Sequence, residues 1–211
     1  MTVKLQQVAQ LPASPTYQYL VDGRRVCVYD GLIDAATIAH YYQTLSKMAF
    51  ARKEFARPAT REYKHWVAEL SLHQGKELGM YQPSLQAAAA LNAVDGGYQV
   101  IRNYCNYASY GDMLFTHVDC APGAGHVTAL WYICTEWDVE WGGETILFNS
   151  GKDAVCAISP KPGRLVVFDG AVPHVGRPPN RICYAPRYTF AYKLAPQPAS
   201  GTTVSAVRGP A

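Results

Sequence analysis

The sequence predicts a mainly β protein with supporting helices, in which the β part forms a jelly roll of two sheets. From residue 98 onward, about eight short apolar runs follow one another, separated by turns and without a helical pattern. The 17 Gly and 14 Pro suit a turn-rich β protein better than a helical bundle. The length of 211 residues predicts one domain over 1–194, with helical support over about 31–97, a β core over about 98–194 and a flexible tail over 195–211.

Two helices are predicted in the first half of the chain. Asp34 is a suitable N-cap for a helix over 35–49, where apolar residues recur at helical spacing. A second helix is predicted from Ser84 to just before Gly96, through a run of alanines. A short β run at 25–29 precedes both. We interpret the helices as supports that pack on a sheet.

Residues 50–70 combine positive charges with aromatic side chains, and Pro58 interrupts any helix there. One interpretation of this segment is a mobile loop or lid that carries positive charge towards an anionic substrate. Arg52, Arg57 and Trp66 are the candidate substrate contacts within it. The alternative is a solvated connection without a binding role.

The β core is predicted from apolar runs that end at turn sequences, such as Trp-Gly-Gly at 141–143 and Pro-Lys-Pro-Gly at 160–163. Runs of this length, without helices between them, are typical of antiparallel sheets. The predicted strands are 98–107, 113–119, 126–134, 144–149, 154–158, 164–168, 171–174 and 183–193.

Charge and cysteine content exclude several classes of protein. A formal net charge of +3 is too small to indicate a nucleic-acid partner. No apolar run is long enough for a membrane span, and the first residues have no apolar region of a signal peptide. The six cysteines have no CxxC spacing and predict reduced thiols rather than disulfides or a zinc site. These observations favour a cytoplasmic protein and leave the oligomeric state open.

His117-Val118-Asp119, with His174 further along the chain, predicts a metal site. In a strand, alternate side chains point the same way, so His117 and Asp119 face one point. A histidine from a distant strand would add the third ligand, and two imidazoles with one carboxylate are typical of non-heme Fe(II) oxygenases. The triplet alone is a weak signal, and the later strand strengthens it. We assign no chemistry to His65, and we place His126 at a strand edge.

That later strand runs over 186–193 and places Arg187, Thr189 and Ala191 on one face. An arginine among small residues on an inward face needs an anionic partner, and its planar fork matches a carboxylate. Beside an iron site, Arg187 would suit the distal carboxylate of 2-oxoglutarate. Thr128 and Tyr132 share a face of the 126–134 run, so Tyr132 is a candidate hydrogen-bond donor to the same carboxylate. Tyr107 is a second candidate donor, and either tyrosine could instead serve only in packing.

Residues from about 100 to 194 resemble the prolyl-4-hydroxylase-like branch of the Fe(II)/2-oxoglutarate-dependent oxygenases. The resemblance implies a double-stranded β-helix in which His117, Asp119 and His174 bind iron. It implies that Arg187 binds the distal carboxylate of 2-oxoglutarate, because it opens the alternating strand. Arg187 follows His174 by thirteen positions, a longer interval than is common in the family, so Arg181 is the alternative. The resemblance rests on 117–119, 128–132, 136–138, 141–145, 160–168, 174 and 187–191, and it suggests cofactor-binding roles for Tyr132, Tyr107, Thr128 and Thr189.

The resemblance implies an Fe(II)/2-oxoglutarate-dependent dioxygenase that hydroxylates an unactivated C–H bond, with O2 as cosubstrate and ascorbate as a candidate reductant. Asp119 favours hydroxylation, because related halogenases lack this carboxylate; desaturation and ring closure stay open. We expect a small-molecule substrate, such as an amino acid or specialised metabolite. The alternatives are a peptidyl (prolyl-type) hydroxylase, a cupin-like enzyme with another metal, and a non-catalytic jelly-roll ligand-binding module. Cys120 is either an additional ligand or a turn residue that points away.

Overall fold

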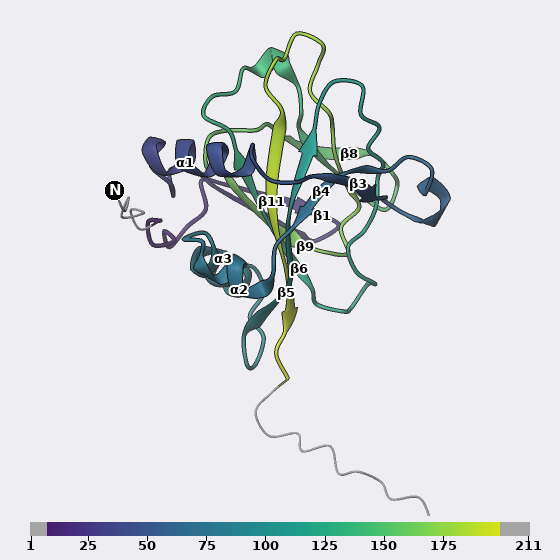
Figure 1. Cartoon of the computed structure of the whole chain (residues 1–211). Helices are drawn as coiled ribbons and strands as arrows, with labels where there is room; N and C mark the ends of the chain where they lie inside the picture. The colour runs from purple at the N-terminus through teal and green to yellow at the C-terminus, as the bar shows by residue number, and fades with distance from the viewer. Residues whose placement is uncertain (1–7, 199–211) are drawn as a thin grey trace, which may run out of the picture.

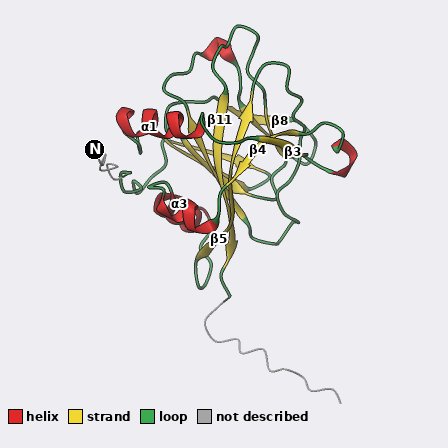
Figure 2. Cartoon of the chain, viewed as in Figure 1, coloured by secondary structure: helices red, strands yellow, loops and turns green. Residues whose placement is uncertain are grey.

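Two antiparallel sheets form the body of the protein in the computed structural model, which describes residues 8–198 (Figures 1 and 2). Among these residues, no helix is both long and apolar enough to cross a membrane. In chain order the elements are β1 (Tyr17–Val21), β2 (Arg24–Tyr29), α1 (Ala35–Leu45), β3 (Ala51–Glu54), η1 (Pro58–Thr60), β4 (His65–Glu69), α2 (Leu72–Glu77), α3 (Tyr81–Leu91), β5 (Tyr98–Ala108), β6 (Val127–Ile133), η2 (Val139–Trp141), β7 (Thr145–Phe148), β8 (Ala154–Ile158), β9 (Leu165–Asp169), β10 (His174–Gly176) and β11 (Arg187–Pro196).

The large sheet has eight strands in the order β1-β2-β9-β6-β11-β5-β4-β3, and the small sheet has three in the order β10-β7-β8. An apolar cluster joins the inner face of the large sheet to the small sheet. Strands that are distant in sequence, such as β2 and β9, lie side by side in the large sheet. Together with the facing small sheet and the few helices, this strand order gives the predicted double-stranded β-helix. The cluster contains Val21, Val26, Val28, Tyr132, Leu147, Cys156, Ile158, Val166, Phe168 and Val172.

Helices α1 and α3 lie on the same side of the large sheet and cover its outer face (Figure 1). Asp34 caps α1 by accepting a 2.8 Å hydrogen bond from the backbone N–H of Thr37. Trp131, on the outer face of β6, is fully buried and donates a 2.9 Å hydrogen bond to Ser84 Oγ of α3. With this face closed by helices, the inner face of the large sheet is the one available for a site.

Most predicted elements are confirmed. Their boundaries differ from the prediction where contacts with distant parts of the chain determine where an element begins or ends. Residues 154–158 form β8 as predicted, whereas α1 ends at Leu45 rather than at 49 and α3 begins at Tyr81. The predicted strand over 113–119 is wrong: apart from one isolated bridge at His117, these residues pair with no strand. Likewise, 171–173 form a turn, and 183–186 form a loop before β11.

The prediction of a loop over 50–70 is wrong for most of its length. The segment forms β3, a 3-10 turn and β4, which extend the large sheet beyond β5. This hairpin exists because β4 pairs with β5, a long-range contact that no local pattern reports. The helix α2 was also not predicted. In the predicted tail, β11 reaches Pro196, and residues 199–211 lie outside the described part.

An ion pair ties the loop after β2 to the start of β9. Arg164 is buried and makes a bidentate contact with Asp30, with Nε–Oδ1 and Nη2–Oδ2 distances of 2.7 and 2.8 Å. The hydrogen bond from Arg164 holds the pKa of Asp30 below its usual value. The pair's contribution is therefore complete above the unfolded pKa of Asp30 and is lost as the pH falls through the lower folded value.

Asp30→Asn is expected to lower the free energy of unfolding by about 2 kcal/mol at pH 7, because a buried guanidinium loses its counter-charge. Urea denaturation measures this difference, which should shrink in acid as Asp30 of the wild type becomes protonated. Glu62→Gln is the control, since its pair with Arg61 is exposed on both sides and should contribute almost nothing. Equal effects of the two substitutions would contradict the structural role of the buried pair.

Candidate metal centre

His117, Asp119 and His174 converge at one end of the small sheet. The backbones of His117 and His174 form an isolated antiparallel bridge, with N–O distances of 3.0 and 2.9 Å. Asp119 is fixed by a 2.7 Å hydrogen bond from its backbone N–H to the carbonyl of Gly170. The candidate ligand atoms of the three residues all lie within 4.8 Å of one another. The predicted clustering of the three side chains is therefore present, although a single bridge rather than a full strand produces it.

Hydrogen bonds to backbone carbonyls set the orientation of both imidazoles. His117 Nδ1 lies 3.0 Å from the carbonyl of Phe115, and His174 Nδ1 lies 2.9 Å from that of Val172. A carbonyl only accepts, so each Nδ1 carries the proton and each Nε2 presents a lone pair. Both Nε2 atoms face the Asp119 carboxylate at 3.6 Å. Two imidazoles and one carboxylate in this orientation fit a ferrous ion.

The protonation states of these groups suit metal binding. Burial lowers the pKa of His174 to about 4, so the ring is neutral near pH 7. Burial alone would raise the pKa of Asp119, but Lys193, His174 and His117 outweigh it and hold the pKa well below its usual range. His174 and Asp119 therefore present lone pairs rather than protons at neutral pH.

Lys193, which the sequence analysis did not select, lies directly beside the triad. Its buried ammonium donates to Asp119 Oδ2 and, at 3.1 Å, to Thr128 Oγ1. The Thr128 hydroxyl donates a 2.5 Å hydrogen bond to the same Oδ2. These contacts occupy Oδ2 and leave Oδ1 as the oxygen for a metal. Lys193 has the same strand parity as Arg187, so the alternation could have identified it.

Arg187 lies deeper in the same region, as predicted, and is only 4% exposed. Its Nε donates to the carbonyl of Gly143 at 2.6 Å, and its Nη2 donates to Thr145 Oγ1 at 3.0 Å. Among the described residues, Nη1 has no hydrogen-bond partner. A small cavity of about 60 Å³ is lined by Arg187, Thr189 and both triad histidines. A carboxylate there would meet a pre-oriented guanidinium close to the metal centre.

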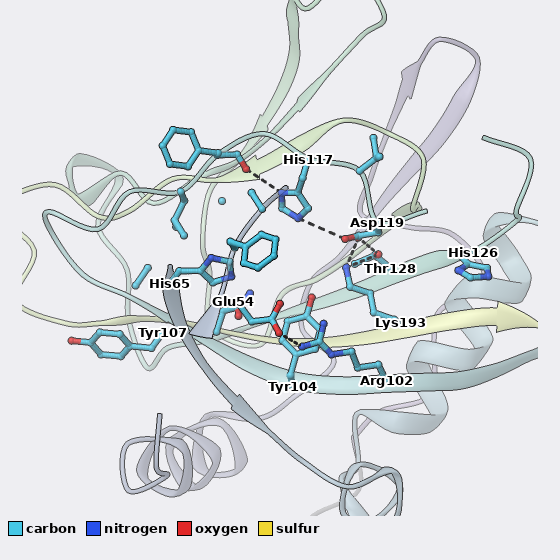
Figure 3. Close-up of a pocket in the computed structure, with 18 of the residues that line it drawn as sticks. Glu54, His65, Arg102, Tyr104, Tyr107, His117, Asp119, His126, Thr128 and Lys193 are labelled. Atoms are coloured by element: carbon cyan, nitrogen blue, oxygen red, sulfur yellow. Dashed lines mark hydrogen bonds and ion pairs between the residues drawn. The ribbon is translucent and has the colours of Figure 1, made fainter. Parts of the chain in front are cut away.

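The two tyrosines of the sequence analysis occupy different places. The Tyr132 hydroxyl lies 2.6 Å from Thr145 Oγ1 and 2.9 Å from the carbonyl of Ile158, so protein groups engage it. Its ring lies 5.2 Å from the Arg187 guanidinium and supports that group. Tyr107 touches the larger cavity, but its ring packs against Tyr188 on the outer face and its hydroxyl points away (Figure 3). The alternative guanidinium, Arg181, is exposed on the loop before β11.

A larger cavity of about 340 Å³ opens beside the triad (Figure 3). His117, Asp119 and Lys193 line one part of it, and residues 54–56 and His65 line another. The triad and the β3–β4 hairpin therefore share one cavity. Its remaining walls include Ile101, Arg102, Tyr104, Asn106, Leu114, Phe115, Val118, His126, Val127 and Thr128.

Arg52, Arg57 and Trp66 do not line this cavity. Arg52 forms a 3.2 Å ion pair with Asp112 and lies over the ring of Trp66 at 5.6 Å. Arg57 donates to the backbone carbonyl of Thr116 on the outside of the cavity wall. The segment therefore lies near the site, but Arg52, Arg57 and Trp66 do not face the cavity.

Cys120 follows Asp119 directly but is separate from the metal centre. It is half-buried, and burial raises the pKa of its thiol. A Cβ added to Gly170 would lie 3.1 Å from its Sγ, so the thiol packs closely against that glycine. Cys120 is neither one of the clustered ligands nor part of the cavity wall, which fits the turn residue that points away.

The chain resembles known proteins in both sequence and structure. Residues 103–192 match the model of the 2OG-Fe(II) oxygenase superfamily, and no curated protein matches the chain. A prolyl hydroxylase from Trichoplax adhaerens, solved with a hypoxia-inducible-factor peptide, is 19% identical with a TM-score of 0.61, covering 81% of this chain and 83% of that one. An oxygenase of the same family from Burkholderia pseudomallei is 14% identical with a TM-score of 0.62, covering 82% and 86%.

A third solved structure, HygX from Streptomyces hygroscopicus with nickel, 2-oxoglutarate and hygromycin B, is 10% identical, with a TM-score of 0.58 and coverage of 81% and 82%. At these identities, the structural likeness supports the fold, while the family model and the clustered His-x-Asp and distal His carry the class of chemistry. Residues 103–192 match the 2OG-Fe(II) oxygenase superfamily, and with the clustered His-x-Asp and distal His they carry the site of an oxygenase that depends on Fe(II) and 2-oxoglutarate.

Proposed function

We propose that this chain hydroxylates a C–H bond of a small molecule, with iron held by His117, Asp119 and His174. The observation that carries the proposal is the continuity of the site. The triad stands between a small cavity that ends at Arg187 and a larger cavity of about 340 Å³. When bound, Fe(II) with 2-oxoglutarate and O2 supplies the oxidant that converts C–H to C–OH, and succinate and CO2 leave.

Arg187 is proposed to hold the distal carboxylate of 2-oxoglutarate. Hydrogen bonds to Gly143 and Thr145 fix its Nε and one Nη. The guanidinium is therefore already oriented and loses little conformational entropy when it binds a carboxylate. Gly176 keeps this group accessible, because a Cβ at that position would lie 3.1 Å from both Nη atoms. Thr189 lines the small cavity, and the ring of Tyr132 packs against the guanidinium. The larger cavity is then left for the substrate.

The third protein ligand favours hydroxylation over halogenation. Asp119 is ionised and held at Oδ2 by Lys193 and Thr128, so its carboxylate occupies the position that a halide would need. A small-molecule substrate is supported by the volume of the larger cavity, which lies within the usual range for such ligands. The structural neighbours include proteins of both kinds, one with hygromycin B and one with a peptide.

Free amino acids are expected to raise the rate of succinate release several-fold above the rate without substrate. The assay contains the protein, Fe(II), 2-oxoglutarate, O2 and ascorbate, and succinate is measured by mass spectrometry together with any product heavier by one oxygen. Proline-rich peptides serve as the comparison, because an extended chain would have to enter the same cavity. Stimulation by the peptides alone would instead make the chain a peptidyl hydroxylase.

A further inference from the structure

The inward faces of β3, β4 and β5 present polar side chains to the larger cavity. Glu54 of β3 lies directly opposite His65 of β4, and Val67 of β4 lies opposite Asn106 of β5. Because side chains alternate along a strand, Glu54, His65 and Asn106 share one face of the sheet. All three line the larger cavity, together with His117 and Asp119 of the triad. Three neighbouring strands thus contribute one polar wall.

The charged group at this wall, which consists of Glu54, Arg102 and Glu69, has a net negative charge, and Glu54 and Arg102 of this group line the cavity. Arg102 donates to Glu54 at 2.7 Å and also to Glu69, so two carboxylates share one guanidinium. One negative charge is therefore left without a compensating partner in the group. Arg102 is further held over the ring of Tyr104 at 4.3 Å, which fixes its position.

The other charged and titratable groups around the cavity do not cancel this negative charge. Lys193 is paired with Asp119, and Arg187, which lines both cavities, is proposed to pair with the distal carboxylate of 2-oxoglutarate. Burial lowers the pKa of His65, so its ring is neutral near pH 7. Burial also keeps the phenol of Tyr104 protonated, because it raises the pKa.

The wall also holds hydrogen-bonding capacity that the protein does not use. Asn106 Oδ1 is buried without a hydrogen-bond partner in the described part of the chain. Buried polar atoms are nearly always paired in native proteins, so an unpaired one beside a cavity indicates a missing ligand. Asn106 lines both the substrate cavity and the smaller cavity of Arg187, and thus stands where the two proposed ligands would meet.

We propose that Glu54, His65 and Asn106 recognise a substrate that carries a cationic amine. The carboxylate of Glu54 accepts from the ammonium group, and His65 and Asn106 contact neighbouring polar atoms. The hydrocarbon part lies along Phe55, Ile101, Leu114 and Phe115, which complete the wall. This inference deepens the proposed function and rests on it. It reverses the sign of the substrate charge expected from Arg52 and Arg57.

The test uses free L-amino acids and their N-acetyl derivatives, which have the same side chains but lack the cationic amine. Wild-type protein loaded with Fe(II) is expected to release succinate faster with at least one free amino acid, and not with its N-acetyl form. Glu54→Gln is expected to raise the KM for that amino acid tenfold or more. Glu54→Asp keeps the charge and should recover part of the loss.

Glu62→Gln is the control. Glu62 pairs only with the exposed Arg61 and does not line the cavity, so its substitution should leave the KM within twofold. Thermal melting of all variants identifies any that do not fold. Equal stimulation by N-acetyl derivatives, no stimulation by any free amine, or equal effects of the two Gln variants would overturn the inference. If the loaded wild type releases no succinate even without substrate, the proposed function itself fails.

Discussion

Asp119→Asn is expected to abolish 2-oxoglutarate turnover and to weaken divalent-metal binding by on the order of 100-fold. The amide keeps the shape of the side chain but removes the anionic donor between the two imidazoles. Titration of the metal-free protein with Co(II), followed by visible absorption and calorimetry, measures the affinity directly. Turnover is followed by succinate release under the conditions used for the wild type.

Lys193 complicates the interpretation of this variant, because Asp119→Asn leaves a buried ammonium without its counter-charge. We expect the free energy of unfolding of the metal-free protein to fall by about 3 kcal/mol. The double variant Asp119→Asn/Lys193→Met removes both charges and should recover much of this stability without recovering metal binding. Undiminished metal affinity in the folded double variant would exclude Asp119 as a ligand.

The clustering of the triad and the inward position of Arg187 could be predicted from short sequence patterns, although a single bridge at His117, and not a strand, aligns the triad. His117 and Asp119 are two positions apart, and Arg187 opens a strand whose parity the sequence displays. The same parity rule applies to Lys193, six positions after Arg187. Parity alone does not single it out, because a lysine near the end of a strand is usually solvated, and only the pairing of β11 with β6 places it at Thr128.

The polar wall could not be predicted, because it depends on a hairpin that local sequence does not specify. Residues 50–70 have no clear period, and β4 is defined by its pairing with β5. From local sequence alone, the many positively charged residues of the segment predict that its positive face contacts the substrate. In the sheet, Arg52 and Trp66 are paired on the outer face, whereas Glu54 and His65 are paired on the inner one. Arg52 and Glu54 are two positions apart, so the β-bulge between them, rather than regular alternation, puts Glu54 on the inner face and decides the sign of the charge that reaches the cavity.

The role of Tyr132 shows a different limit of sequence reasoning. Alternation correctly places it on the inner face of β6 with Thr128. Alternation does not predict which groups lie within hydrogen-bond distance of the end of a side chain. Here the Tyr132 hydroxyl contacts Thr145 and the carbonyl of Ile158 in the small sheet. The tyrosine thus connects the two sheets under Arg187 and leaves the guanidinium as the group that faces the cavity.

Arg187→Met is expected to raise the Kd of 2-oxoglutarate by on the order of 100-fold, because the carboxylate loses a pre-oriented, charged donor in a buried cavity. Calorimetric titration of the metal-loaded protein measures this change. Metal affinity should stay within a few-fold of the wild type, since Arg187 is not one of the clustered ligands. Loss of cosubstrate binding with retained metal binding separates this residue from the triad.

Two further variants test why 2-oxoglutarate binding is lost. They separate the position of Arg187 and the access to its guanidinium from the mere presence of a positive charge nearby. Arg181→Met removes the alternative guanidinium, which is exposed, and should leave the Kd of 2-oxoglutarate unchanged. Gly176→Ala keeps Arg187 but places a methyl group 3.1 Å from both Nη atoms, and should also weaken binding. If Arg181→Met weakens binding while Arg187→Met does not, the carboxylate is held by the loop before β11. The small cavity beside the triad would then have another occupant.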